Sequence, residues 1–412
     1  MTTQGTAGQN IRKIPVGRLR PGMYIHDINC GWMDHPFVAN HFPVKDLATI
    51  RKINDLGIHE VYIDTSRGHN VEEEAPTQAE VRQQIEARLA DIAVESTVPM
   101  RTPLAEESRR AARLHSEATL IVRGMIRDIR LGKQIELEQV EPLVEGMIDS
   151  IFRNPDALLP LGRLKEHDSY TFQHSVSVCT LMIAFARGLG LERATIKEIA
   201  IGALLHDVGK AQVPDGILNK PAKLTDAEFA KMKSHVVQSI IILQHTPGIT
   251  QIALDVAGQH HERFDGTGYP NKLKGNEISL YGQMGAIVDV YDAITSDRVY
   301  HKGMPPTEAL GKLLEWSEYH FDPELVKKYI KSIGIYPTGS LVRLSSGRLA
   351  IVLEQNPDKP MRPRIWVMYN AKGGCYLKPE TVDLSHPTNK DHIVGHEEFS
   401  AWNIDPYKWL QG

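Results

Sequence analysis

Two histidine–carboxylate clusters lie within one stretch of this chain. The first is the pair His206-Asp207, which Lys210 follows, and the second contains the adjacent pair His260-His261. Imidazole and carboxylate groups are the ligands that hold transition metal ions in hydrolytic sites. If these side chains converge in the fold, the sequence predicts a metal-dependent hydrolase, for which a phosphate ester is a natural substrate.

The pair His206-Asp207 ends an apolar segment, 199–205, which predicts that the pair is buried. An isolated pair of this kind is usually a surface feature or a helix cap. A buried carboxylate, however, needs a cation or several hydrogen-bond donors around it. Lys210 supplies one positive charge, but a metal ion would compensate the burial better.

Three further positions have side chains of the same ligand types. Asp289 and His174 have mostly apolar neighbours, while His235 stands in a segment where a surface or capping role is common. An adjacent pair such as His260-His261 is often a helix cap or a surface pair, but its two imidazoles can also bind two metal ions, one each. Each signal alone is modest, and the combination suits a dinuclear site with ions about 3.5–4 Å apart.

The ligand set is made of nitrogen and oxygen donors and contains no thiolate. This composition favours iron or manganese over a structural zinc ion, with zinc and nickel as alternatives. The candidate ligands are spread over separate predicted helices, so a helical domain has to position them.

The region from 105 to 335 has the apolar spacing of α-helices. Apolar stripes run from Leu114 to Ile129 and from Val140 to Ile151, and further helices are expected at 170–187, 193–207, 225–243, 249–261, 280–297, 306–315 and 322–333. This pattern predicts one all-α domain, whose size is plausible for a single core.

The flanking regions have different patterns. Residues 1–70 predict a small α+β module with a helix at 47–56, ended by Gly57, and a strand at 61–63. Residues 71–104 predict a linker that is partly helical from Gln78. Residues 336–412 predict a small β-rich element with strands near 341–344, 350–353 and 365–369. The expected fold class is therefore mainly α.

The composition permits full-sized cores and excludes some classes of protein. The chain has 412 residues, 42% of them hydrophobic, and a net charge of -4, so two or three domains are expected and nothing indicates a nucleic-acid polymer as partner. The longest apolar run, 176–186, is too short for a membrane span. The three cysteines are far apart, and the N-terminus has no signal pattern, which predicts a cytoplasmic protein.

The chain resembles the HD-GYP phosphodiesterases in three segments. These are HDVGK at 206–210, GQHHERFDGTGYP at 258–270 and GAIVDVYDAITSDRVY at 285–300. This family is a branch of the HD-domain metal phosphohydrolases, and the resemblance extends over about 105–335. It implies an HD-type helical fold and hydrolysis of the second messenger cyclic di-GMP to linear pGpG, with GMP as a further product in some members.

The resemblance also assigns roles to residues of this chain. The implied metal ligands are His174, His206, Asp207, His235, His260, His261 and Asp289. Asp207 would bridge two ions, and a hydroxide between the ions would be the nucleophile. Lys210 and Arg298 would contact phosphate. Gly268, Tyr269 and Pro270 would lie at the edge of the site, in substrate placement or in docking of a partner protein.

One position departs from the family. Some members have a glutamate one helical turn before the residue that matches His174, where it helps to hold a third metal ion, and this chain has Tyr170 there. A phenol is a poor ligand for such an ion. We therefore expect a dinuclear centre, and complete hydrolysis to GMP is left open.

The N-terminal region resembles a small domain that often precedes HD-GYP domains, and we interpret it as a regulatory or interaction module. Two alternatives to the phosphodiesterase remain. One is a slow receptor for cyclic di-GMP that signals to partner proteins through the loop with Tyr269 and Pro270. The other is an HD hydrolase that acts on another nucleotide.

Overall fold

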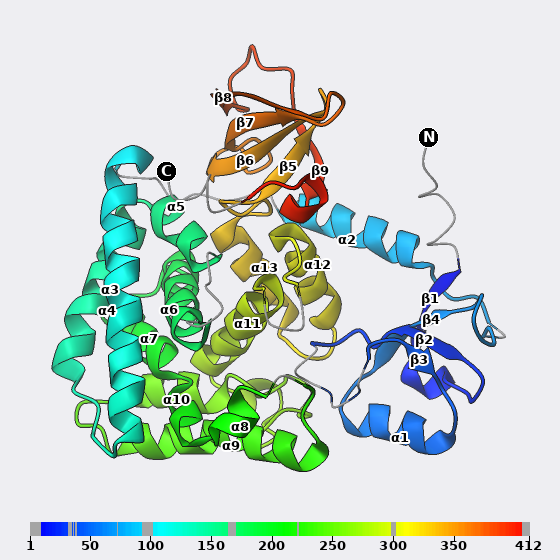
Figure 1. The fold of residues 1–412 in the computed structure, drawn as a ribbon, viewed down its shortest axis with the longest axis horizontal. Helices are drawn as coiled ribbons and strands as arrows, with labels where there is room; N and C mark the ends of the chain where they lie inside the picture. Colours follow the sequence, from blue (N-terminus) through cyan, green and yellow to red (C-terminus); the bar gives the residue numbers. More distant parts are fainter. Residues whose placement is uncertain are drawn as a thin grey trace.

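The computed structural model of the chain describes residues 10–31, 35, 37, 39–71, 73–92, 102–163, 170–220, 222–297 and 302–405. Among these residues, helices occupy the middle of the sequence, with one β-sheet before them and another after them. Figure 1 shows the N-terminal sheet at the lower right of the helices and the C-terminal sheet above them. The predicted fold class, mainly α with two flanking modules, is confirmed.

Four antiparallel strands and one helix form the N-terminal module, which we define as residues 10–71. Its elements are β1 (Ile11–Pro15), β4 (Glu60–Asp64), β2 (Tyr24–Asp27) and β3 (Phe42–Pro43), in their order across the sheet, and α1 (Leu47–Asp55). The Asp46 carboxylate caps α1 by accepting the Thr49 N–H at 2.8 Å. Ile53 of α1 and Val61 of β4 share one apolar core. The predicted helix and the predicted strand at 61–63 are thus both present.

Helix α2 (Gln78–Ile92) connects this module to the helical domain. Val81 packs with Ile11 and Tyr62 of the module, whereas Leu89 and Ile92 belong to the core of the helical domain. The helix contacts β1 on one side and α12 and α13 on the other. It begins at Gln78, where the sequence predicts a helix, and it contributes to two cores at once.

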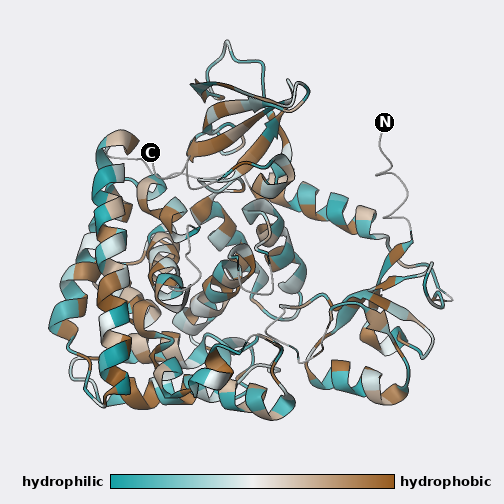
Figure 2. Ribbon diagram, viewed as in Figure 1, coloured by the Kyte–Doolittle hydropathy of each residue, from teal (hydrophilic) through white to brown (hydrophobic). Residues whose placement is uncertain are grey.

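The helical domain follows the predicted segments closely. Its helices are α3 (Leu104–Arg130), α4 (Leu137–Arg153), α5 (Pro155–Leu158), α6 (Tyr170–Gly188), α7 (Arg193–Leu205), α8 (Asp215–Leu218), α9 (Asp226–Gln244), α10 (Gln251–Gln259), α11 (Leu280–Thr295), α12 (Pro306–Trp316) and α13 (Pro323–Ile333). Their buried apolar residues form one continuous cluster. Figure 2 shows apolar and hydrophilic residues alternating along α3, as expected for a helix with one buried face.

Five of these helices pack as one group. Helix α7 lies against α6 and α10, α10 also lies against α9 and α11, and α11 lies against α6. Side-chain caps fix the start of three of them, because Thr225, Thr250 and Ser279 each accept a backbone N–H of the first turn. Helix α9 has a complete capping box with Glu228. This group of helices positions the candidate site.

The C-terminal element is a five-stranded antiparallel sheet. Its order is β8 (Cys375–Asp383), β7 (Arg364–Asn370), β6 (Arg348–Glu354), β5 (Leu341–Leu344) and β9 (Ile393–Glu397). Strands β5, β6 and β7 contain the segments that the sequence predicts. Strands β8 and β9 were not predicted, because neither shows an apolar alternation, and most side chains of β8 are exposed. None of the helices in the described part of the chain has the length and apolar content that a membrane crossing requires.

Candidate metal centre

Five helices bring the predicted ligands to one place inside the helical domain. His174 lies on α6, His235 on α9 and Asp289 on α11, whereas His206-Asp207 and His260-His261 directly follow α7 and α10. All of these side chains are buried except that of His261, which is partly exposed. Because α7 and α10 are apolar to their last turn, the residues that follow them are carried into the interior.

The first group of ligand atoms contains His174, His206 and Asp207, whose candidate donor atoms all lie within 4.8 Å of one another. The Nε2 atom of His206 lies 3.3 Å from Oδ2 of Asp207, and the Nε2 atom of His174 lies 3.5 Å from the same oxygen. Asp289 adds a second carboxylate, with its Oδ1 atom 3.0 Å from His174 Nε2. We call these four residues the first cluster.

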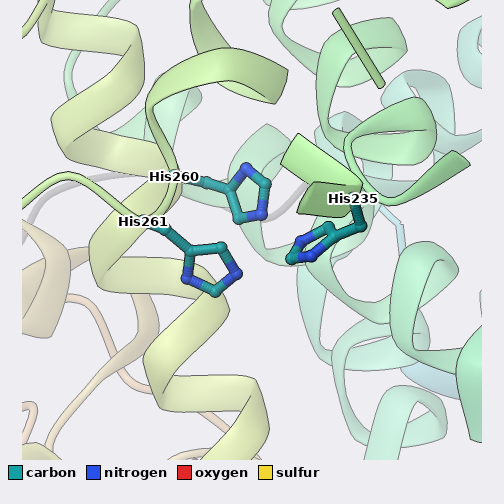
Figure 3. Close-up of side chains that lie close together, drawn as sticks. All are labelled: His235, His260 and His261. Atoms are coloured by element: carbon teal, nitrogen blue, oxygen red, sulfur yellow. The ribbon is translucent and has the colours of Figure 1, made fainter. Parts of the chain in front are cut away.

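The second cluster contains His235, His260 and His261, whose donor atoms also lie within 4.8 Å of one another. Figure 3 shows the three imidazoles gathered around a common space, with the adjacent pair on one side and His235 on the other. The Nε2 atom of His235 lies 3.2 Å from Oδ1 of Asp207. The two oxygens of the Asp207 carboxylate therefore face different clusters.

Backbone contacts fix the orientation of three imidazoles. The Nδ1 atoms of His206, His235 and His260 each donate to the carbonyl oxygen three residues earlier, at 2.7, 2.8 and 2.9 Å. A carbonyl oxygen only accepts, so the Nδ1 atoms have the hydrogens. In the neutral imidazole this leaves an Nε2 lone pair that points into the site, which is the tautomer that metal coordination requires.

These inward-facing atoms have no hydrogen-bond partner within the described residues. Four buried atoms lack such a partner, namely Nε2 of His206, His235 and His260 and Oδ1 of Asp207. The Nε2 atom of His235 and the Oδ1 atom of Asp207 lie close together without a hydrogen bond between them. Buried acceptors that face one another are costly unless a cation lies between them. The donor set therefore fits divalent metal ions.

The electrostatics of the cluster agree with this fit. Burial and the neighbouring His206 lower the pKa of His260 to about 3, and burial together with His260 holds the pKa of His261 well below its usual value. Burial opposes the ionisation of Asp207, but Lys210 and His206 outweigh it and keep that pKa far below the ordinary range. Neutral imidazoles and ionised carboxylates are the forms that coordinate metal ions.

His206 is different, because the charge of its neighbours favours its protonated form. Burial disfavours that form, but the adjacent Asp207 carboxylate outweighs burial and raises the pKa of His206. A metal ion at its Nε2 atom would take the place of this proton, so metal binding and proton release are coupled here.

The structure adds one functional residue that the sequence analysis missed. The Oδ2 atom of Asp292 lies 2.6 Å from Nδ1 of His174, and its Oδ1 atom accepts the hydroxyl of Ser177. Asp292 thus orients His174 in the way that carbonyl oxygens orient the other imidazoles. The signal was present in the sequence, because Asp292 follows Asp289 by three positions and therefore lies on the same face of α11.

The turn Val208–Gln212 brings Lys210 next to the first cluster. The Lys210 ammonium group bonds to Asp207 Oδ2, and its side chain is 16% exposed, so it reaches from the buried carboxylate toward the surface. A Cβ atom at Gly209 would lie 2.0 Å from the carbonyl oxygen of His235. The glycine therefore permits the close approach of this turn to α9, which sets Asp207 opposite His235.

Residues 262–273, which we call the site loop, follow directly after His261. The buried Glu262 carboxylate holds the loop by accepting the N–H groups of Asn271 at 2.7 Å and Leu273 at 3.1 Å. A Cβ atom at Gly268 would lie 2.3 Å from the backbone nitrogen of Arg263, so this position needs glycine. The loop thus folds back on the turn that carries the histidine pair.

Tyr269 lies beside the second cluster. Its ring stacks on that of His261, with centroids 4.7 Å apart and an angle of 22° between the planes, and its N–H donates to the His261 carbonyl at 3.1 Å. Pro270 follows through a cis peptide bond. A cavity lined by Gly268, Tyr269, His260 and His261 opens next to the cluster. Of the residues predicted at the edge of the site, Gly268 and Tyr269 line this cavity, and Pro270 is the next residue in the chain.

Two expectations of the sequence analysis concern residues that the structure does not describe in full. Arg298 lies outside the described residues. Tyr170 is the first residue of α6, but its side chain lies outside the described part. The roles assigned to both remain predictions.

Comparison with known proteins finds three family matches along the chain. Residues 11–140 match a domain of unknown function (DUF3391), residues 153–325 match the HD domain, and residues 341–390 match a KOW domain associated with the HD domain. The geometry of the site and the second match together define an HD-domain protein.

Named relatives narrow this class. A cyclic di-GMP phosphodiesterase of Pseudomonas aeruginosa is 43% identical over 395 residues, which cover 96% of this chain and 94% of the relative. A cyclic di-GMP phosphodiesterase of Vibrio cholerae is 36% identical over 218 residues, 47% of this chain and 44% of that protein. A 3'3'-cGAMP-specific phosphodiesterase of the same species is 39% identical over 139 residues, 34% and 27% of the two chains. This chain belongs to the HD-GYP family of cyclic di-GMP phosphodiesterases, which confirms the resemblance seen in its sequence.

Proposed function

We propose that this protein hydrolyses cyclic di-GMP at a centre of two metal ions. The observation that carries the proposal is the position of Asp207, whose two carboxylate oxygens each face one cluster of imidazoles. A carboxylate in this position suits two neighbouring ions. The relatives that are named cyclic di-GMP phosphodiesterases, one of them aligned over nearly the whole chain, supply the substrate class.

The ligands divide between two ions. His174, His206 and Asp289 would hold one ion, His235, His260 and His261 would hold the other, and Asp207 would contribute to both. Two bound ions would supply an ionised water as the nucleophile and would polarise the phosphate oxygens. The nitrogen and oxygen donors favour iron or manganese, with zinc and nickel as alternatives.

Lys210 and Arg298 act on the phosphate. The ammonium group of Lys210 is anchored on Asp207 and can donate to a non-bridging phosphate oxygen, where it offsets the negative charge that grows in the transition state. Arg298 supplies a guanidinium contact to phosphate. Water adds to phosphorus, the bond to a ribose 3' oxygen breaks, and that oxygen leaves with a proton, which yields linear pGpG.

The cavity beside the second cluster receives the nucleotide. Tyr269 and Phe229 both line it, and the Lys233 ammonium lies 5.2 Å and 4.8 Å from the centroids of their rings. Aromatic faces can stack on a guanine base, and an ammonium group suits the second phosphate of the cyclic dinucleotide. Gly268 and Pro270 shape this edge of the cavity.

Three further assignments belong to the proposal. Residues 105–335 form the catalytic domain, and the accessory parts are an N-terminal region at 1–70, a linker at 71–104 and a C-terminal element at 336–412. Tyr170 leaves the centre with two ions, so that pGpG is the main product. The protein acts in the cytoplasm, where the messenger is present and the three cysteines stay reduced.

The central test compares Asp207→Ala with wild type, both purified without oxygen. Metal content per chain and hydrolysis of cyclic di-GMP are measured, with products separated by chromatography. We expect wild type to contain about two metal ions and to form pGpG. Asp207→Ala should lose metal and at least about a hundredfold in turnover. Asp149→Ala, which removes an exposed carboxylate on α4, serves as the matched control.

Undiminished turnover in Asp207→Ala would contradict the proposal. Cyclic di-GMP that binds to wild type without metal-dependent turnover would instead indicate a receptor. Parallel assays with 3'3'-cGAMP test the other alternative, which the relative from Vibrio cholerae suggests. Preferential hydrolysis of that dinucleotide would replace the substrate but keep the metal centre.

A further inference from the structure

The N-terminal module contacts the site loop directly. The Nε2 atom of His59 lies 2.7 Å from Oδ2 of Asp265, and a guanidinium nitrogen of Arg263 donates to the carbonyl oxygen of Leu56 at 3.2 Å. The His59–Asp265 contact joins positions 206 residues apart in the sequence. Two residues of the loop, close to the histidine pair, are thus held by a different domain.

A glycine allows the two parts to meet. Gly57, which follows α1, has a φ of +70°, and a Cβ atom there would lie 2.4 Å from the Cβ atom of Thr267. Thr267 is itself held, because its hydroxyl and N–H donate to Asp265 Oδ1 at 2.6 and 2.8 Å. The backbone at Gly57 therefore rests on a fixed part of the site loop.

The turn between α12 and α13 joins the same contact from a third side. The ring of His59 stacks on that of Tyr319, with centroids 4.3 Å apart and an angle of 18° between the planes. His320 Nε2 donates to the Gly57 carbonyl at 3.3 Å, and the His320 carbonyl accepts the N–H of Phe264 at 2.9 Å. Residue 320 thus links the module to the site loop through its own backbone and side chain.

The other side of the site loop faces the metal centre. Tyr269 stacks on His261 there, and Glu262 fixes the path between Arg263 and the far end of the loop. The cavity at this place is lined by Asp55 and Leu56 of the N-terminal module as well as by His261 and Tyr269. The module therefore forms part of the wall of the cavity next to the candidate ligands.

We propose that the N-terminal module positions the site loop for catalysis, through His59 and Gly57 acting on Asp265 and Thr267. This inference rests on the proposed function. It adds that the module positions the part of the site that binds substrate, while the helices hold the two clusters of candidate metal ligands. Displacement of the module shifts Tyr269 and the cavity wall. A small misplacement of a substrate-positioning group is enough to slow an enzyme considerably.

The first experiment uses Gly57→Ala in the full-length chain. The added methyl group meets Thr267, so KM for cyclic di-GMP should rise about tenfold while metal content stays at the wild-type level. The double variant Gly57→Ala/Thr267→Gly restores the space, and its KM should return to that of Thr267→Gly alone. Gly132→Ala is the matched control, because Gly132 has a similar φ of +80° and open space where the Cβ atom would lie.

The second experiment covers the case in which Gly57→Ala unfolds the module. His59→Ala should raise KM about fivefold, and its effect and that of Asp265→Ala should be less than additive in the double variant, because both changes remove the His59–Asp265 contact. His26→Ala, an exposed histidine of the same module, should leave KM unchanged. Equal KM values for wild type, Gly57→Ala and His59→Ala would overturn the positioning role.

A generic diester separates this inference from the proposed function. Bis(p-nitrophenyl) phosphate needs the metal ions but not the nucleotide cavity, so Gly57→Ala and His59→Ala should hydrolyse it at the wild-type rate. A wild-type protein that hydrolyses neither diester would refute the metal-dependent phosphodiesterase itself. A wild-type protein that hydrolyses both, with variants that match it on cyclic di-GMP, would refute only the positioning role.

Discussion

The two accessory parts meet the helical domain through junctions of different chemistry. At the N-terminal junction, the buried Glu315 of α12 accepts the Tyr62 hydroxyl at 2.7 Å and lies 3.1 Å from Lys13 and 3.2 Å from Lys312. At the C-terminal junction, the buried carboxylate is Asp156 of α5, which accepts the Gln355 N–H at 2.9 Å and the Thr338 hydroxyl. Glu315 thus has lysine partners, whereas the two groups that donate hydrogen bonds to Asp156 are neutral.

The positions of the junctions differ as well. The N-terminal junction continues through Gly57 and His59 onto the site loop, whereas α5 packs against α3 and α4. Figure 1 shows the C-terminal sheet above the helices and the N-terminal module beside their lower half. Directional, charged contacts fix an orientation better than burial alone does. We infer that the first junction affects both stability and catalysis, and that the second affects stability alone.

The largest effect is expected from the charged network at the N-terminal junction. Glu315→Ala removes the shared partner of Lys13 and Lys312 and should lower the free energy of unfolding by about 3 kcal/mol, at the lower end of the range for breaking a buried ion pair. The lower end applies because Lys13 keeps Glu60 at 2.6 Å. Urea denaturation of the full chain measures this change.

Glu308→Ala on the same helix is the matched control for Glu315→Ala. The Glu308 side chain is half exposed and its ion pair with His396 spans 3.7 Å, so its removal should cost less than about 1 kcal/mol. Equal losses of unfolding free energy in the two variants would show that the buried Glu315 network stabilises the protein no more than an exposed ion pair does.

The sequence predicts the centre of the molecule better than its junctions. The helices at 193–207 and 225–243 are found at Arg193–Leu205 and Asp226–Gln244, because long apolar periods and capping residues define a helix locally. The pairs at 206–207 and 260–261 follow buried helix ends, where side chains can meet. The residue types and the family resemblance therefore together predict that the candidate ligands lie together.

The parts that escaped prediction depend on contacts between distant residues. Asp265 and Thr267 stand in a glycine-rich turn whose sequence indicates only a turn, and nothing local pairs them with His59 or Gly57. Asp292 was missed because it acts on a ligand rather than on the metal. Strands β8 and β9 were missed because neither has an apolar alternation, so that pairing with a neighbouring strand defines them instead.

A smaller effect, with a distinct pH dependence, is expected at the C-terminal junction. Burial raises the pKa of Asp156 to about 6, and the Thr338 and Gln355 donors only partly offset this. The folded state then binds a proton more tightly than the unfolded chain, so its stability rises as the pH falls through 6 toward the ordinary aspartate value. As the pH falls from about 7.5 to about 4.5, protonation of Asp156 raises the free energy of unfolding by about 2 kcal/mol.

Asp156→Asn isolates this contribution, because an amide does not titrate. The difference in unfolding free energy between wild type and variant should change by about 2 kcal/mol across this pH window. Wild type should become more stable relative to the variant as the pH falls. Turnover of cyclic di-GMP at pH 7.5 should stay at the wild-type level, since the junction lies away from the site loop. Parallel pH profiles of stability would contradict the raised pKa, and lost turnover would contradict the division between the junctions.

The smallest effect is expected from an exposed ion pair that also joins the N-terminal module to the helical domain. Lys52 of α1 lies 3.1 Å from the carboxylate of Asp226, the first residue of α9, and both side chains are largely solvent-accessible. Such a pair contributes at most about 0.5 kcal/mol, and salt screens it. Lys52→Ala should therefore leave the melting temperature and KM close to wild type at physiological ionic strength. A rise in KM as large as that of His59→Ala would mean that surface charge, and not contact with the site loop, sets the orientation of the module.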